Sequence, residues 1–331
     1  MIRAEGLTKY YRVTERKTGR FAALRTLLTA KSKLVTAVSD MNFEIPRGGF
    51  VGYIGPNGAG KSTTIKMLTG ILHPDGGRVE VAGFSPQEQR KEVAQRMGVV
   101  FGQRTQLWWD LPCKDSFELL AAMYKVERRE YDKAMSEYAS LLDIGEFIDT
   151  PVRKLSLGQR MRADLVAALL HNPEILFLDE PTIGLDVVAK TRIRSFLKEL
   201  NQAEEKTILL TTHDMDDIEQ LCKQIIIINH GQKVYDGTLE ELREQYPMPS
   251  LLDVEFHGFV NEAHLPEGAQ YDPTYNRVKV LFDKVTTRPM PLIDRLGECA
   301  EVRDIQIQTP RIEEVIRQIY QEGHAAVKVK S

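Results

Sequence analysis

The chain has 331 residues, of which 42% are hydrophobic and 27% charged, so it has the composition of an ordinary globular protein with room for two domains. A formal net charge of −3 gives no electrostatic reason to expect a nucleic-acid partner, and three widely spaced cysteines suit a reducing compartment rather than a metal cluster. The N-terminus has no signal-peptide core and every aliphatic run is too short to cross a bilayer, so we expect any membrane role to be exercised from the cytosolic side through a partner.

Residues 1–100 show strand-like alternation on both sides of one glycine-rich loop, Gly55-Pro-Asn-Gly-Ala-Gly-Lys-Ser62, which satisfies G-x-x-x-x-G-K-[ST]. GFVGYI before the loop predicts a strand and TTIKMLTGIL after it predicts a helix, which is the context of a phosphate site. Glycines let successive N–H groups point inward, and the helix adds its positive end. We therefore predict that Lys61 binds the β- and γ-phosphates and that the Ser62 hydroxyl binds Mg²⁺.

Residues 104–154 carry helical periodicity and many charges, with no comparable strand run. This segment contains the only tryptophan pair, Trp108 and Trp109, in QLWWDLP. Tryptophans are frequent both at interfaces and in cores, so two interpretations stay open: contact with a partner, or burial of at least one ring.

The segment LSLGQRMRADL at residues 155–165 predicts a capped helix start. Ser156 is a favourable N-cap, and Gln159 three residues later completes a capping box. Gly158 leaves room for a phosphate to approach the backbone, while Leu157 is the first helical position. The apolar residues that would share one face of the helix are Met161, Leu165, Ala168 and Leu169.

Residues 160–246 alternate between helices and strands, and the runs EILFL, TILLTT and IIIIN predict buried parallel strands. Asp179 ends the first of these strands, where ligands bind in open α/β sheets and where a carboxylate suits Mg²⁺. The adjacent Glu180 is placed to orient or deprotonate a water, and His213 ends the TILLTTHDM strand. An acid and an imidazole would thus face one crevice and supply the positioning and charge stabilisation that phosphoryl transfer needs.

A smaller α+β unit is predicted from residue 247, after a stretch punctuated by Pro247 and Pro249. LLDVEFHGFV and RVKVLF alternate as strands do, and PRIEEVIRQIYQEG predicts a helix that stops near Gly323. The residues expected on the apolar face of this helix are Ile312, Val315, Ile316 and Ile319. No catalytic constellation appears in this unit, so we expect it to be accessory.

With these motifs in this order, residues 1–245 resemble the nucleotide-binding subunits of ABC transporters, most of all those that serve ABC-2 type exporters. The resemblance implies an α/β fold: a P-loop NTPase (RecA-like) core with an antiparallel β subdomain and a helical subdomain at about 104–160, all within residues 1–246, and a small C-terminal α+β domain at 247–331. It implies an ATPase that lies peripherally on the cytoplasmic face of the membrane. Two subunits, expected to form a homodimer, would close around two Mg-ATP and so power a separate ABC-2 type permease.

The resemblance also assigns roles to individual residues. Tyr11 would stack on adenine, and Asp186 would be the D-loop aspartate at the dimer seam. For hydrolysis, Asp179 would be the metal carboxylate, Glu180 the catalytic base, His213 the γ-phosphate contact and Gln103 the Q-loop glutamine that senses Mg²⁺ and the γ-phosphate. The nucleotide-binding Walker A residues would be Gly55, Pro56, Asn57, Gly58, Ala59, Gly60, Lys61, Ser62 and Thr63. The signature residues, acting on ATP bound to the other subunit, would be Ser156, Gly158 and Gln159.

Three features depart from the family pattern. Leu157 replaces a signature glycine, Gly102 separates Phe101 from Gln103, and Ile183-Gly184 stands where Ser-Ala is common. Leucine favours a helix over glycine by up to about 1 kcal/mol. We therefore expect Leu157 to tighten the helix start or seal the dimer seam without abolishing ATP contact.

A basic insertion at about residues 12–35 separates the first two strand patterns, where the family needs only about a dozen residues. Its apolar residues Phe21, Leu24, Leu27 and Leu28 fall on one helical stripe flanked by Lys and Arg. One interpretation is an amphipathic element that touches the inner leaflet or the permease. The other, which we favour, is a solvated excursion with a short helix packed on the domain.

The alternative function is that of a soluble ABC-type ATPase acting on DNA or the ribosome. No sustained heptads lie between Lys61 and Ser156, where DNA-repair members carry coiled coils. The chain has one cassette where ribosome-associated members have two, and its slight net acidity disfavours nucleic acid. A kinase is disfavoured because it would not need a signature segment.

Overall fold

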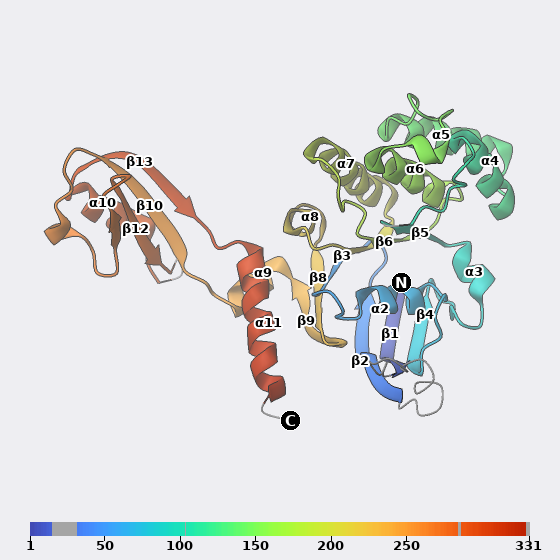
Figure 1. The fold of residues 1–331 in the computed structure, drawn as a ribbon, viewed down its shortest axis with the longest axis horizontal. Helices are drawn as coiled ribbons and strands as arrows, with labels where there is room; N and C mark the ends of the chain where they lie inside the picture. The colour runs from blue at the N-terminus through green and yellow to red at the C-terminus, as the bar shows by residue number, and fades with distance from the viewer. Residues whose placement is uncertain (15–31, 103, 284–285, 329–331) are drawn as a thin grey trace, which may run out of the picture. The chain divides into compact units, whose positions relative to one another are not determined.

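The computed structural model describes residues 1–14, 32–102, 104–283 and 286–328 (Figure 1). The chain forms two compact units, Met1–Thr238 and Leu239–Ser331. The domain boundary at 246/247 stays a prediction, since this division by compactness assigns helix α9 (Leu239–Gln245) to the second unit. Most of the basic insertion, including its apolar stripe, lies outside the described residues.

A six-stranded sheet organises the first unit, in the order β5-β6-β7-β3-β8-β9. All neighbours are parallel except β8 and β9. The apolar runs that predicted buried parallel strands are β6, β7 and β8, and every residue of β3 and β7 is buried. The strands are β3 (Phe50–Ile54), β5 (Met97–Phe101), β6 (Ile175–Asp179), β7 (Thr207–Thr211), β8 (Gln224–Asn229) and β9 (Gln232–Thr238).

A second, antiparallel sheet has the order β2-β1-β4, with β1 (Ile2–Thr14), β2 (Ser32–Ile45) and β4 (Gly76–Val81). Its buried face, which includes Leu7, Met41 and Val79, shares one hydrophobic cluster with Tyr53 of β3 and Ile65 of the helix that follows. The antiparallel β subdomain implied by the resemblance is therefore packed onto the core that carries the glycine-rich loop.

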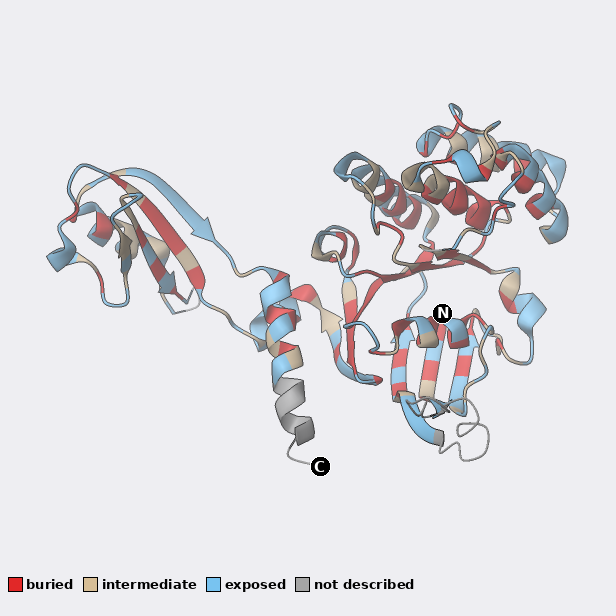
Figure 2. Cartoon of the chain, in the orientation of Figure 1, coloured by how far each residue is buried: buried red, intermediate tan, exposed pale blue. Residues whose placement is uncertain are grey.

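Helices α4 to α7 lie on one side of the central sheet, and α2 lies on the other side with the antiparallel strands (Figure 1). The segment 104–154 is mainly helical, as its periodicity predicted. The four apolar residues expected on one face of α6 are all buried, and Figure 2 shows the burial along the chain. The helices are α2 (Lys61–Leu68), α3 (Arg90–Ala94), α4 (Cys113–Tyr124), α5 (Arg128–Leu141), η1 (Val152–Lys154), α6 (Leu157–Leu169), α7 (Val187–Glu204) and α8 (Met215–Leu221).

The second unit has its own antiparallel sheet, in the order β11-β12-β10-β13, and its own core, to which Leu296 of α10 contributes. The four apolar residues predicted on the last helix are buried, but the predicted stop at Gly323 is wrong, because α11 continues through it. The remaining elements are β10 (Ser250–His257), η2 (Glu262–His264), β11 (Gln270–Asp272), β12 (Arg277–Phe282), α10 (Pro289–Gly297), β13 (Glu301–Gln308) and α11 (Ile312–Lys328). None of the helices described in either unit has both the length and the apolar character needed to cross a bilayer.

Candidate functional site

The glycine-rich loop connects the end of buried strand β3 to the first turn of α2, as its motif predicted. Gly58 and Gly60 have φ values of 82° and 106°, a region that favours glycine. A Cβ on Gly60 would lie 2.6 Å from the Ala37 carbonyl oxygen, so this position also needs glycine for lack of space. The loop thus curls back over the helix start, where free N–H groups attract anions.

Lys61 lies at the first position of α2 and is buried, with 8% of its surface exposed. Its ammonium donates hydrogen bonds to the carbonyl oxygens of Gly55 and Pro56 at 2.6 and 3.2 Å. Burial lowers the pKa of this ammonium, and the negative charges of Glu180 and Asp179 act in the opposite direction. The cation is therefore held under the loop, where a phosphate would replace the carbonyls as its partner.

Asp179 ends β6 and carries two hydroxyl contacts that reach it from different elements. The Ser62 hydroxyl donates to its Oδ2 at 3.2 Å, and the Thr211 hydroxyl at the end of β7 donates to its Oδ1 at 2.5 Å. Among the described residues no group of three or more His, Cys, Asp or Glu side chains forms a metal site. Two hard oxygen donors beside a phosphate loop nevertheless fit Mg²⁺, which prefers one or two protein ligands completed by phosphate oxygens and water.

Glu180 and His213 follow the ends of neighbouring strands and meet at the same edge of the sheet. The two strands are parallel, with Asp179 opposite Thr211. Strand β7 ends at Thr211, so the predicted strand end at His213 was two residues too late. His213 Nδ1 lies 3.6 Å from Glu180 Oε1, and the imidazole remains 64% exposed toward solvent. An exposed imidazole beside a carboxylate is available to an incoming ligand.

One cavity of about 910 Å³ joins these groups. Lys61, Asp179, Glu180 and His213 all line it, so the acid and the imidazole do face one crevice, as predicted. Of the other proposed nucleotide residues, those that line it are Gly55, Pro56, Asn57, Gly58, Gly60, Ser62 and Thr63, whereas Ala59 is buried behind the loop. Ala37, Lys66, Ile71, Phe101, Gly102, Arg104 and Ile183 complete the lining.

The Q-loop segment reaches this cavity through Gly102. The Gly102 N–H donates to the Asp179 carbonyl at 2.7 Å, and a Cβ on Gly102 would lie 2.3 Å from the Glu180 carbonyl oxygen. The departure from the family pattern at this position therefore has a steric reason. Gln103 itself lies outside the described residues. Its neighbour Arg104, which sequence reasoning did not select, lines the cavity.

The signature segment forms the predicted capping box at the start of α6. The Gln159 N–H donates to Ser156 Oγ at 3.2 Å, and the Ser156 N–H donates to Gln159 Oε1 at 2.9 Å. Leu157 is the first helical residue, and its Cδ2 lies 3.0 Å from where a Cβ on Gly184 would stand. Two departures from the family pattern are thus neighbours in space. None of the signature residues lines the cavity of their own chain.

Tyr11 and Asp186 lie away from the cavity lining. Tyr11 is on β1 opposite Val35 and is 39% exposed. Asp186 is the N-cap of α7, where its carboxylate accepts a hydrogen bond from the Ala189 N–H at 2.8 Å. Both side chains are therefore surface groups of this chain, and their proposed roles stay predictions.

The tryptophan pair is not part of the core, since Trp108 and Trp109 are 39% and 51% exposed. The Arg160 guanidinium lies over the Trp109 ring, 5.5 Å from its centroid. The interpretation in which one ring is buried is therefore wrong. Both rings are available for contact with a partner.

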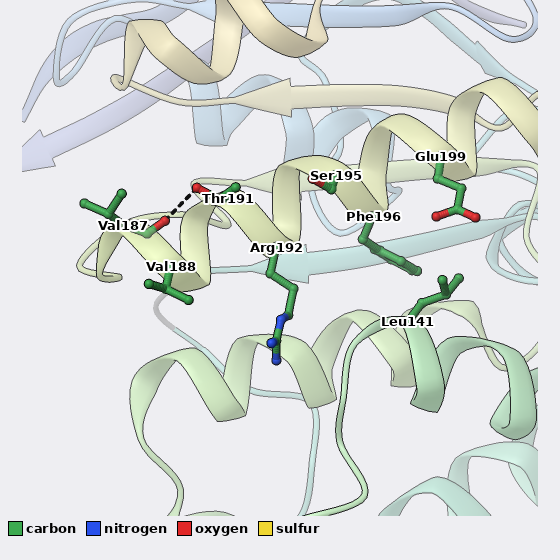
Figure 3. Close-up of a pocket in the computed structure, with 8 residues that line it drawn as sticks. All are labelled: Leu141, Val187, Val188, Thr191, Arg192, Ser195, Phe196 and Glu199. Carbon is green, nitrogen blue, oxygen red and sulfur yellow. Dashed lines mark hydrogen bonds between the residues drawn. The ribbon is translucent and has the colours of Figure 1, made fainter.

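A second cavity of about 490 Å³ lies between the end of α5 and one face of α7 (Figure 3). Its lining is mostly aliphatic and aromatic carbon, with Arg192 pointing across it toward the neighbouring helices. Its lining contains neither a carboxylate pair nor a glycine-rich loop, and its only charged residues are Arg192 and Glu199. The chemistry of the first unit is therefore concentrated in the cavity beside the glycine-rich loop.

Comparison with known sequences agrees with this site. A family model described as ABC transporter matches residues 38–183. The ABC transporter ATP-binding protein NatA of Bacillus subtilis is 36% identical over 214 residues, which cover 65% of this chain and 87% of NatA. The linearmycin resistance ATP-binding protein LnrL of the same organism is 32% identical over 230 residues, 70% of this chain and 73% of LnrL. The daunorubicin/doxorubicin resistance ATP-binding protein DrrA of Streptomyces peucetius is 36% identical over 210 residues, 62% of each chain.

Solved structures give the same fold. The ATP-binding cassette MJ0796, solved as a dimer in a post-hydrolysis state with ADP and Pi, superposes with a TM-score of 0.60 at 27% identity, covering 72% of this chain and 99% of that one. The ATP-binding subunit of an ABC transporter superposes with a TM-score of 0.62 at 24% identity, covering 74% of this chain and 92% of the other. The P-loop architecture expected from the sequence is thus confirmed.

Proposed function

Because the chain belongs to the ABC transporter family of ATP-binding subunits, and is an ATPase of that family, we propose that its loop-side cavity is the Mg-ATP site that drives an ABC-2 type exporter. The observation that carries this proposal is the convergence of Lys61, Asp179, Glu180 and His213 on one cavity. The named roles of the relatives LnrL and DrrA in antibiotic resistance support an export function.

In the proposed mechanism the loop N–H groups and Lys61 hold the phosphates of ATP. Ser62 and Asp179 would hold Mg²⁺, which would neutralise part of the phosphate charge. Glu180 orients the attacking water and accepts its proton, and His213, 3.6 Å from that carboxylate, contacts the γ-phosphate. The aspartate is held by Thr211 from the neighbouring strand, so it needs little reorganisation when the substrate arrives.

A second copy and a permease complete the proposed assembly. The cassette MJ0796 was solved as a dimer, and we propose that this chain likewise pairs with a second copy and acts with a membrane permease. We assign Ser156, Gly158 and Gln159 to the ATP of the partner copy, since they do not reach the cavity of their own chain. The exposed Trp108 and Trp109 supply the surface that meets the cytoplasmic side of the permease, which would hold the chain on the inner face of the membrane.

Two substitutions test the ATP site. Glu180→Gln removes the proton acceptor but keeps shape and hydrogen bonding, so ATP binding should persist while turnover falls by at least about 100-fold. Lys61→Ala should weaken binding of both ATP and ADP. Nucleotide affinity and phosphate release are measured with and without Mg²⁺. Unchanged turnover in Glu180→Gln would remove the glutamate from the base role, and unchanged affinities in Lys61→Ala would move the phosphates elsewhere.

The exporter assignment has its own test. The chain is co-expressed with a candidate ABC-2 type permease, and the complex is purified in detergent. We expect the two to co-purify and Trp109→Ala to reduce recovery, with the exposed Tyr275→Ala of the second unit as a matched aromatic control. Full recovery of Trp109→Ala would show that the tryptophan is not an anchor.

A further inference from the structure

We propose that Arg104 contacts the γ-phosphate of ATP bound to its own chain, as an arginine supplied from the end of β5. This inference rests on the proposed ATP site. Arg104 lines the same cavity as Lys61, Asp179, Glu180 and His213. Neither the glycine-rich loop nor the signature segment contains it, so the phosphate motifs leave it without a role.

The backbone on the near side of Arg104 is held against the end of β6. The Arg104 N–H donates to the Phe101 carbonyl at 2.9 Å, and the two residues form an antiparallel bridge. Gly102 donates to the Asp179 carbonyl at 2.7 Å, and its missing side chain allows it to lie against the Glu180 carbonyl. Arg104 therefore lines the cavity from a segment that is hydrogen-bonded to the end of β6, whereas the glycine-rich loop follows β3.

The backbone on the far side of Arg104 is held by the signature helix α6. The Thr105 hydroxyl and the Gln106 N–H donate to one carboxylate oxygen of Asp164 at 2.8 and 3.1 Å. The Gln106 side-chain amide donates to the Asp164 carbonyl at 3.1 Å, and Asp164 is buried. Hydrogen bonds hold the chain on both sides of Arg104. The backbone position of Arg104 therefore does not depend on contacts of its own solvent-exposed side chain.

The guanidinium of Arg104 is available to a ligand. Within the part of the chain that the structure describes, it forms neither an ion pair nor a side-chain hydrogen bond. Lys61, by contrast, already donates to two loop carbonyls. Arginine carries a permanent charge and a planar fork that matches phosphate oxygens in a bidentate manner.

The γ-phosphate is the phosphate that this position favours. The loop N–H groups and the start of α2 attract the phosphates as a group, and Lys61 is expected on the β- and γ-phosphates. Arg104 follows the segment that is hydrogen-bonded to Asp179, and Asp179 and Glu180 are the carboxylates proposed to act where the bond to the terminal phosphate breaks. A contact made only with the γ-phosphate distinguishes ATP from ADP, which supplies the measurement.

The test compares the affinities of Mg-AMP-PNP and Mg-ADP, measured by titration calorimetry on the full chain. Arg104→Ala should weaken AMP-PNP binding by about tenfold while ADP binding changes less than about twofold. Arg104→Lys should recover part of the loss, because it keeps the charge but not the fork. Arg129→Ala, an exposed arginine of α5 that does not line the cavity, is the matched control and should change neither.

An equal loss for both nucleotides, or no loss for either, would overturn the γ-phosphate contact. Failure of the ATP site as a whole looks different, because Lys61→Ala would then leave both affinities unchanged. Retained AMP-PNP binding in Arg104→Ala together with lost binding in Lys61→Ala would reject the role of Arg104 alone.

Discussion

At the scale of single residues, Glu180 shows how the surroundings hold a reactive group in an unfavourable conformation. Its φ is 56°, in the left-handed region, which costs a non-glycine residue about 1 kcal/mol or more. The Glu180 N–H donates to the Thr211 carbonyl at 2.9 Å, and Gly102 lies against the Glu180 carbonyl. Glu180 is thus aimed into the cavity by neighbours that are distant in sequence.

Gly102→Ala should disturb this arrangement. The added methyl would lie 2.3 Å from the Glu180 carbonyl oxygen and 3.0 Å from that of Asp179, so the backbone of the catalytic edge must move. Because displacements of about 1 Å cost on the order of 100-fold in rate, we expect the kcat for ATP to fall by about that factor. Gly145→Ala is the matched control, since its methyl would meet nothing within 4 Å. Equal activity of the two variants would contradict the steric argument.

Asp164→Asn should reveal a buried acid through the pH dependence of stability. Burial raises the pKa of Asp164 to about 6 in the folded chain, against the hydrogen bonds from Thr105 and Gln106 and the charge of Arg160. An unfolded aspartate titrates near pH 4, so the folded state binds more protons between about pH 4 and 6, and stability falls as pH rises through that window. Asparagine stays neutral and keeps the acceptor oxygen.

The wild-type free energy of unfolding, relative to that of Asp164→Asn, should therefore decrease by about 2 kcal/mol from pH 4 to pH 7. Urea unfolding of both chains at several pH values measures this difference, in which most other titrating groups cancel. A constant difference would mean that Asp164 titrates normally.

At the scale of elements, short sequence patterns predicted the features that depend on neighbouring residues in the sequence. Apolar runs located β3, β6, β7 and β8, and the Ser156 to Gln159 spacing located the start of α6. The Arg104 position escaped prediction because it depends on Phe101 pairing with Asp179, far along the chain. The Gly323 stop failed because a glycine lowers helix propensity by only about 1 kcal/mol.

The Leu157 and Gly184 pair belongs to this scale, because it joins the start of α6 to the loop before α7. Leu157→Gly should change ATP turnover by less than about tenfold, since the capping box is retained.

Gly184→Ala should destabilise the chain by about 1 kcal/mol or more, because the φ of Gly184 is 69° and the added methyl would lie 3.0 Å from Leu157 Cδ2.

The double variant Leu157→Gly with Gly184→Ala measures the contact itself. Removing the leucine side chain relieves the clash but not the backbone strain, so the two effects should fail to add by about 0.5–1 kcal/mol in urea unfolding. Strict additivity would place the two side chains out of contact. A much larger loss of turnover in Leu157→Gly would assign the leucine a role at the dimer seam instead.

At the scale of the whole molecule, chemistry and accessory structure are separated. Every residue that lines the proposed ATP cavity lies between Ala37 and His213, within the first compact unit. The second unit has a separate core built around β10, β12 and α10. Each unit therefore buries its own apolar surface, which is the condition for independent folding.

A chain ending at Thr238 should accordingly keep the ATP site. We expect its Kd for Mg-AMP-PNP to lie within about twofold of the full-length value, because no lining residue is removed. At a ligand concentration of about 100 Kd, nucleotide binding should stabilise the truncated chain by about 2.7 kcal/mol. In the full chain, the same nucleotide should raise the unfolding temperature of the first unit and leave that of the second unit unchanged. Differential scanning calorimetry with and without nucleotide separates the two transitions. If the truncated chain lost nucleotide affinity, or if both transitions rose together, the second unit would be coupled to the ATP site rather than accessory to it.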